Sequence, residues 1–148
     1  MKVLYDTSTL FAALVITHPH HLVCFTHLQT VQTGENQGYA STHSLAELYS
    51  IITRYPAQPR VTPAEAELLI TDMLQYLQVV PLTLKHYQAA IAAMVGLNLP
   101  GGGIFDALLA QAALEIEADS LLISILDFGL AILDCQSQNL LGFRQLNL

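Results

Sequence analysis

The chain has 148 residues, of which 53% are hydrophobic and 11% are charged, and its formal net charge is −7. Its length suits one domain with a sizeable core, and no apolar run reaches the length of a membrane-spanning helix. With only five lysines and arginines, the chain has too few cations to bind nucleic acid by general neutralisation of phosphates.

Short apolar runs alternate along the chain with longer segments of helical periodicity. The clearest boundary lies at Thr62, where a threonine precedes a proline and is followed by Glu65, the pattern of a capped helix start. In chain order we expect a strand at 2–5, helices at 8–15 and 19–34, a strand at 38–42, helices at 43–55 and 62–77, a strand at 79–82, a helix at 83–96, a helix after the glycine loop 101–103, and strands at 120–124 and 141–148.

This alternation predicts the fold class. Strands joined through helices form right-handed crossovers, which make the strands parallel and place helices over both faces of the sheet. We therefore expect residues 1–148 to form a single α/β domain, a three-layer α/β/α sandwich around a twisted, mostly parallel sheet of four to five strands. The high apolar content further predicts a surface that binds a partner or a second copy of the chain.

Three acidic residues stand out, because each is the lone acid of an apolar neighbourhood. Asp6 follows the first strand, Glu47 lies in the first turns of the helix after the second strand, and Asp106 lies in the first turn after the glycines. On a helical wheel Asp106 points away from the polar positions Gln111 and Glu115. Since sites in open α/β sheets lie beyond the carboxyl ends of the strands, we expect the three carboxylates to meet there.

Each acid also has an ordinary structural interpretation, which the sequence leaves open. Asp6 could cap the helix that follows it. Glu47 could form a capping box with Ser44, because Ser44-Leu-Ala-Glu47 fits the S-x-x-E pattern. Asp106 could complement the dipole of its own helix.

A cluster of the three acids would need a positive charge. Two carboxylates about 4 Å apart repel each other by about 4 kcal/mol at an effective dielectric constant of about 20. Oxygen ligands without Cys or His favour Mg²⁺ or Mn²⁺, and such sites commonly act on phosphates. The pattern therefore predicts a divalent-cation site for phosphate chemistry.

Three segments, VLYDTSTLFAAL, STHSLAELYSIITRYP and GGGIFDALLAQAALEIEADSLL, span most of the chain. In order and spacing they resemble the PIN-domain family, in particular the VapC-like toxins of type II toxin–antitoxin pairs. The resemblance implies a Mg²⁺- or Mn²⁺-dependent endoribonuclease that hydrolyses RNA phosphodiester bonds, forms a homodimer and is neutralised by a cognate antitoxin protein. It also implies Asp6, Glu47 and Asp106 as catalytic metal ligands and Ser8 as the small polar residue that supports Asp6.

The sequence departs from the family pattern at the fourth strand. The family usually has a T-x-N/D-x-(x)-D-F segment there, and its N or D adds to the acidic site. The matching stretch is LLISILDF, in which Ile123 and Ile125 stand at the polar positions and Asp127, a candidate further metal ligand, matches the terminal aspartate. A second hypothesis therefore stays open: a degenerate PIN domain that binds a protein partner or RNA without efficient cleavage.

Other residues also have both a functional and a structural interpretation. Arg54 could contact a substrate phosphate or the last carbonyls of its own helix. His18, His20 and His21 could hold a transition metal, although exposed imidazoles at a helix entry explain them more simply. Asp6 interrupts the apolar N-terminal segment, which argues against a signal peptide, and we expect a cytoplasmic protein.

Overall fold

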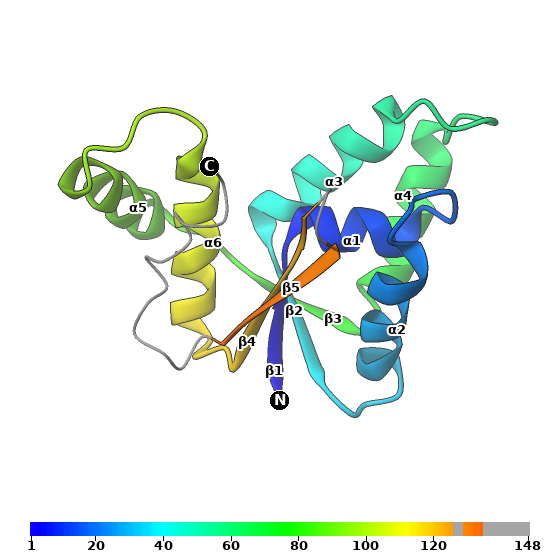
Figure 1. The fold of residues 1–148 in the computed structure, drawn as a ribbon, viewed down its shortest axis with the longest axis horizontal. Coiled ribbons are helices and arrows are strands. Elements are labelled where there is room, and N and C mark those ends of the chain that lie inside the picture. The colour runs from blue at the N-terminus through cyan, green and yellow to red at the C-terminus, as the bar shows by residue number, and fades with distance from the viewer. Residues whose placement is uncertain (126–128, 135–148) are drawn as a thin grey trace.

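The structure is a computed structural model that describes residues 1–125 and 129–134. In these residues, a pair of helices follows each of the first three strands, and two strands come last (Figure 1). The strands are β1 Lys2–Tyr5, β2 Gln37–Ser41, β3 Leu77–Val80, β4 Ser120–Ile125 and β5 Gly129–Asp134. The helices are α1 Thr7–Leu14, α2 His21–Gln32, α3 Thr42–Arg54, α4 Pro63–Met73, α5 Leu84–Gly96 and α6 Gly103–Glu115.

The strands form one sheet in the order β3-β2-β1-β4-β5. The strands β1 to β4 are parallel, and Leu4 of β1 pairs with Tyr39 of β2 and with Leu121 of β4. The last strand, β5, pairs with β4 in the antiparallel direction. The predicted mostly parallel sheet is confirmed, and its fifth strand is Gly129–Asp134. The strand expected at 141–148 lies outside the described residues.

Helices cover both faces of the sheet, which confirms the predicted three-layer sandwich (Figure 1). Helices α1 to α4 lie on one side of the sheet, and α5 and α6 lie on the other. Val3 and Tyr5 belong to the buried cluster that packs against α1 to α4, whereas Leu4 belongs to the cluster that packs against α6. Because successive residues of a strand point to opposite faces, this one strand contributes to both cores.

Local sequence explains where α4 begins and ends. The predicted capping box is present: Thr62 Oγ1 accepts from the backbone N–H of Glu65 at 3.3 Å, and Glu65 Oε2 accepts from the backbone N–H of Thr62 at 2.7 Å. The helix ends at Met73, earlier than predicted, because Leu77 already belongs to β3. The helix start follows from local chemistry, whereas its end depends on the neighbouring strand.

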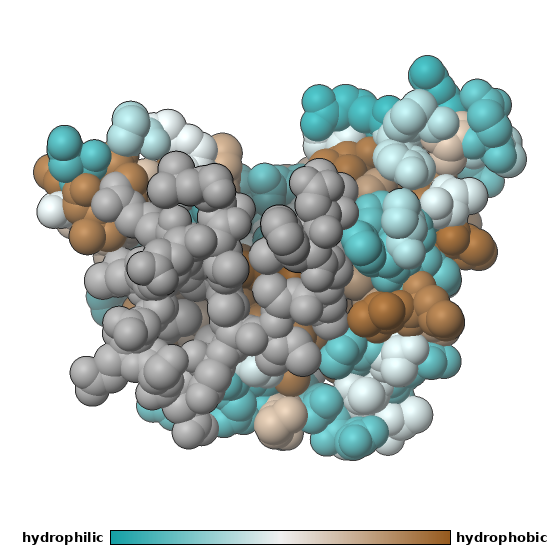
Figure 2. Space-filling view, in the orientation of Figure 1, coloured by the Kyte–Doolittle hydropathy of each residue, from teal (hydrophilic) through white to brown (hydrophobic). Residues whose placement is uncertain are grey.

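The surface carries exposed apolar side chains. On α5, Leu84, Ile91 and Val95 are 72%, 54% and 74% exposed, and Figure 2 shows hydrophobic atoms over this helix at the left of the view. This exposure agrees with the apolar composition, and the predicted homodimer stays a prediction. In the part of the chain that the structure describes, no helix combines the length and the hydrophobicity needed to cross a membrane.

Candidate active site

Asp6 directly follows β1 at the carboxyl edge of the sheet. Its backbone N–H donates to the carbonyl oxygen of Leu122 in β4 at 3.0 Å, which continues the ladder between β1 and β4. Its carboxylate accepts from the backbone N–H of Ser8 at 3.3 Å and from the Ser8 hydroxyl, so Asp6 caps α1 and Ser8 orients the acid. Burial raises the pKa of Asp6, hydrogen bonds from Ser8 lower it, and the charge of Glu47 raises it further.

Glu47 reaches the site from the second turn of α3. Its Oε2 accepts from the hydroxyl of Thr7 at 2.8 Å. The capping box with Ser44, which the sequence left open as an alternative, is not formed, because the N-cap of α3 is Ser41, whose Oγ accepts from the backbone N–H of Ser44 at 3.0 Å. The parallel pairing of β1 with β2 brings the starts of α1 and α3 together, so Glu47 meets Thr7 instead of its own helix terminus.

Asp106 lies in the first turn of α6. This helix runs against the direction of β4, so its first turn lies at the carboxyl edge of the sheet (Figure 1). Burial is the main cause that raises the pKa of Asp106, and the charges of Asp6 and Glu47 raise it further. The three predicted acids are therefore electrostatically coupled, although each comes from a different helix start.

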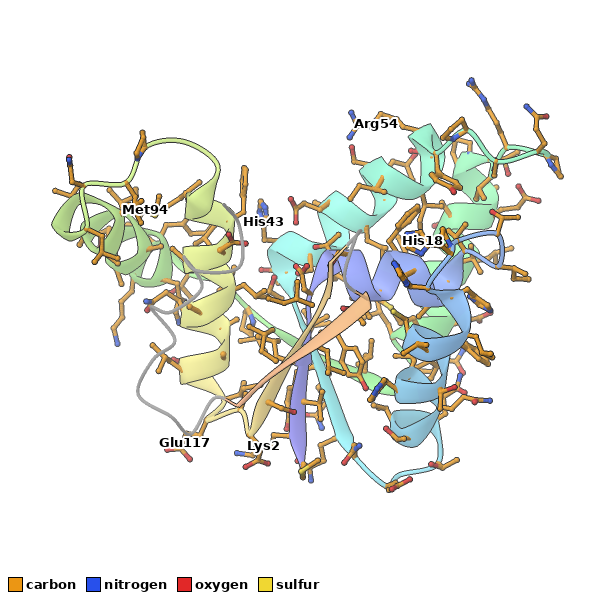
Figure 3. The ribbon with its side chains drawn as sticks, viewed as in Figure 1. Lys2, His18, His43, Arg54, Met94 and Glu117 are labelled. Carbon is orange, nitrogen blue, oxygen red and sulfur yellow. The ribbon has the colours of Figure 1, made fainter. Side chains whose placement is uncertain are left out.

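The three acids line one pocket of about 240 Å³. Figure 3 shows His43 in the space between α3 and α6, where this pocket lies. Hydroxyls accompany the carboxylates, and apolar side chains complete the walls. The lining residues are Asp6, Thr7, Ser8, Ser41, His43, Ser44, Glu47, Ile51, Phe105, Asp106, Leu108 and Leu109.

The donor atoms of this pocket suit a hard divalent cation, because Mg²⁺ and Mn²⁺ prefer carboxylate and other oxygen ligands. A cation would also stabilise the charged forms of Asp6 and Asp106, which burial disfavours. Among the described residues, no three His, Cys, Asp or Glu side chains stand close enough together to hold a metal ion as a group. Mg²⁺ commonly keeps several water ligands and binds through one or two protein carboxylates, so the carboxylates that line this pocket suit it as a donor set.

Of the two further candidates from the sequence, Arg54 is not among the described residues that line the pocket. Arg54, the last residue of α3, donates through Nε to the carbonyl oxygen of Ser50 at 3.0 Å. It lies at the opposite end of α3 from His43 (Figure 3), which favours its interpretation as a residue that binds its own helix end. Asp127, the candidate further ligand, lies outside the described residues.

The histidines at the entry to α2 have structural contacts. His18 is buried, packs edge-on against Phe11 with ring centroids 5.2 Å apart, and accepts at Nδ1 from the backbone N–H of His20 at 3.2 Å. His21, where α2 begins later than predicted, places Nδ1 3.1 Å from the carbonyl oxygen of Ala12. These contacts favour a structural role for the histidines over a transition-metal site. The expectation that all three imidazoles are exposed is wrong for His18, which is buried.

Sequence reasoning missed two neighbours of the acids, His43 and Phe105. Their rings stack with centroids 5.2 Å apart and planes 16° from parallel. Among the described residues, His43 Nε2 is a buried atom without a hydrogen-bond partner, and it lies 3.7 Å from Glu47 Oε1. A signal was present in the sequence: His43 stands one helical turn before Glu47, and Phe105 directly precedes Asp106.

Comparison with known proteins identifies the class to which this fold and site belong. Residues 3–131 match the PIN domain. Over 118 residues, which are 77% of this chain and 78% of the relative, the chain is 32% identical to Ribonuclease VapC27 of Mycobacterium tuberculosis (strain ATCC 25618 / H37Rv). The chain therefore belongs to the PIN-domain family.

Solved structures show the same fold. One similar structure is VapBC2 from Rickettsia felis bound to a DNA fragment from their promoter, with a TM-score of 0.61, 18% identity, and coverage of 86% of this chain and 90% of that chain. Another is Mycobacterium tuberculosis VapC20, a sarcin–ricin loop cleaving toxin, with a TM-score of 0.64, 15% identity, and coverage of 80% and 86%. The predicted PIN-like fold and the resemblance to VapC proteins are confirmed.

Proposed function

We propose that this chain is a Mg²⁺- or Mn²⁺-dependent endoribonuclease that acts as the toxin of a toxin–antitoxin pair. The observation that carries the proposal is the pocket shared by Asp6, Glu47 and Asp106 in a chain of the PIN-domain family. One relative is named a ribonuclease, and one structural neighbour is described as a toxin that cleaves the sarcin–ricin loop. These names support RNA as the substrate.

The residues of the pocket have different roles in this proposal. Asp6 and Asp106 would hold the cation, and Glu47 would complete its coordination. When bound, a divalent cation lowers the pKa of water and offsets the charge of a phosphodiester. Ser8 keeps the Asp6 carboxylate in one orientation, and Thr7 does the same for Glu47. Without a cation the carboxylates repel a phosphate, so RNA and cation bind together.

A degenerate PIN domain is the second candidate. Ile125, the last residue of β4, stands where the family pattern has a polar residue, and no three described acids or histidines form a metal-holding group as they stand. Such a domain would bind a protein partner or RNA without efficient cleavage. Metal binding distinguishes the two candidates, because only the nuclease requires it.

Cleavage of structured RNA tests the first proposal. We expect the wild-type protein to cut RNA in the presence of Mn²⁺ or Mg²⁺, leaving 5′-phosphate and 3′-hydroxyl ends, and we expect Asp6→Asn and Asp106→Asn to abolish cutting. Asp72→Asn is a matched control, since Asp72 is an exposed acid on α4 outside the pocket, and it should cut like the wild type. Equal cleavage by the wild type and Asp106→Asn would contradict the proposal.

Calorimetry with Mn²⁺ gives a readout that does not depend on activity. The wild type and Asp72→Asn should bind the metal, and Asp6→Asn and Asp106→Asn should bind it more weakly, because each loses a negatively charged oxygen ligand. A folded wild-type protein that binds no Mn²⁺ at millimolar concentration would favour the degenerate domain.

The toxin role and the assembly are tested separately from the chemistry. Expression of the chain in a bacterial host should arrest growth, and co-expression of a small protein encoded directly upstream, if it is the antitoxin, should restore it. Sedimentation of the purified chain should show the proposed homodimer. Unchanged growth with an active nuclease would contradict the toxin role and leave the ribonuclease proposal intact.

A further inference from the structure

The described lining of the pocket carries almost no positive charge for binding RNA. None of the described residues that line it is a lysine or arginine. Lys2 lies at the amino end of β1, away from the pocket, where its Nζ donates to the carbonyl oxygen of Ile116 at 2.9 Å, and Arg54 lies at the far end of α3 (Figure 3). Because counterion release requires cations beside the phosphates, the described lining contributes little of it, and a contact that needs no lysine or arginine would add to the binding by the proposed cation.

Phe105 provides an aromatic face at the pocket. Phe105 is 49% exposed, and its ring is stacked on that of His43. The His43 side chain is 25% exposed, so His43 is the more buried ring of the pair and Phe105 the more exposed one. The stacked His43 ring favours one orientation of Phe105, and the exposed part of the Phe105 ring can receive a further planar group.

We propose that Phe105, backed by His43, is the stacking platform for one unpaired base of the RNA substrate. Phe105 directly precedes Asp106, and both line the pocket, so the stacked base belongs to a nucleotide at or next to the phosphate at the carboxylates. Stacking accepts any base, because every base has a π face, and it needs no lysine or arginine. This inference rests on the proposed RNA substrate and adds the contact that binds it.

Fluorescence of short single-stranded RNA oligonucleotides tests the platform. Each oligonucleotide carries one 2-aminopurine, whose emission is quenched when it stacks, and the set moves this base along the strand. All proteins carry Asp106→Asn so that the RNA is not cut, and Mg²⁺ is present in excess to offset the weaker metal binding expected of this variant. We expect quenching at one position or more, and we expect Phe105→Leu, which keeps apolar bulk without a ring, to weaken binding by about 5- to 150-fold.

Matched variants separate stacking from general damage. Phe105→Trp should keep the quenching, because indole stacks as well as phenyl. Tyr49→Leu removes a 44% exposed ring of α3 that lies outside the pocket, and it should bind like the parent. His43→Ala should reduce the quenching, and His43→Phe should restore it, because a phenyl ring also backs Phe105. The affinity should fall only weakly with added KCl, with a logarithmic slope of about −0.7 for each phosphate contacted.

Three results would overturn the inference: equal binding by Phe105→Leu and the parent, an equal loss in Tyr49→Leu, or no quenching at any position in the parent. Cleavage by the protein with intact Asp106 is measured in parallel. Quenching without cleavage supports the platform and contradicts the ribonuclease proposal. Cleavage with unaltered binding by Phe105→Leu contradicts the platform and supports the ribonuclease.

Discussion

Replacement of Thr7 by valine should destabilise the protein through one hydrogen bond. The change keeps the branched shape of the side chain and removes the hydroxyl that donates to Glu47 Oε2 at 2.8 Å, in a residue that is only 4% exposed. Hydrogen bonds to charged groups contribute about 1.5–3 kcal/mol. The Glu47 side chain is 35% exposed, so water replaces part of the lost bond. We therefore expect Thr7→Val to lower the free energy of unfolding by about 1–2 kcal/mol.

A double-mutant cycle isolates this bond from the other effects of each substitution. Thermal and urea unfolding are measured in chelator for the wild type, Thr7→Val, Glu47→Ala and the double variant. The coupling energy should be about 1–2 kcal/mol, and Thr7→Val alone should lower the melting temperature by about 2–8 °C. A coupling energy near zero would refute the reasoning, because it would mean that the bond is absent or that water replaces it fully.

Two further changes test the electrostatics of the site and the packing beneath it. Asp6→Asn should raise the melting temperature of the metal-free protein at neutral pH, because burial raises the pKa of Asp6 and disfavours its charge in the folded state. The stability that Asp6 contributes is fully present below its pKa in the unfolded chain and is lost as the pH rises through its pKa in the folded protein. A melting temperature of Asp6→Asn that stayed above that of the wild type in acid would therefore contradict this reasoning. Gly38→Ala should cost about 1–3 kcal/mol of stability by overpacking, since its Cβ would lie 2.5 Å from Leu77 Cδ2 and 2.7 Å and 2.8 Å from the methyl groups of Val31. Gly96→Ala, whose Cβ would meet nothing within 4 Å, should keep or raise the melting temperature, and an equal loss in both alanine variants would argue against overpacking.

Local patterns were sufficient to predict the features that depend on neighbours in the chain. The start of α4 follows from the threonine, proline and glutamate around Thr62, and the structure shows that capping box. The edge at which the acids lie follows from chain order, because the carboxyl ends of parallel strands share one edge of a sheet. The two interpretations of Asp6, as a helix cap and as a residue of the site, are compatible, since one carboxylate both caps α1 and lines the pocket.

Contacts between distant segments were not predictable, because they depend on which strands are neighbours. Glu47 meets Thr7 only because β2 lies beside β1, and the Ser44 pattern failed because the helix already has its cap at Ser41. The position of β5 had a signal that sequence reasoning overlooked. Gly129 follows the end of β4 after three intervening residues, and a parallel partner would need a crossover of about a dozen residues or more, so only an antiparallel pair fits.

Two features of the site bear on different steps of the proposed nuclease reaction. An isoleucine at 125, where the family pattern has a polar residue, offers no oxygen ligand, and this would affect the proposed cation. The absence of Lys and Arg from the described pocket lining affects the RNA instead. Either one would lower cleavage by the proposed nuclease, so cleavage alone does not distinguish them. Calorimetry with Mn²⁺ reports on the first and quenching of 2-aminopurine on the second, so a weak nuclease can be assigned to one cause.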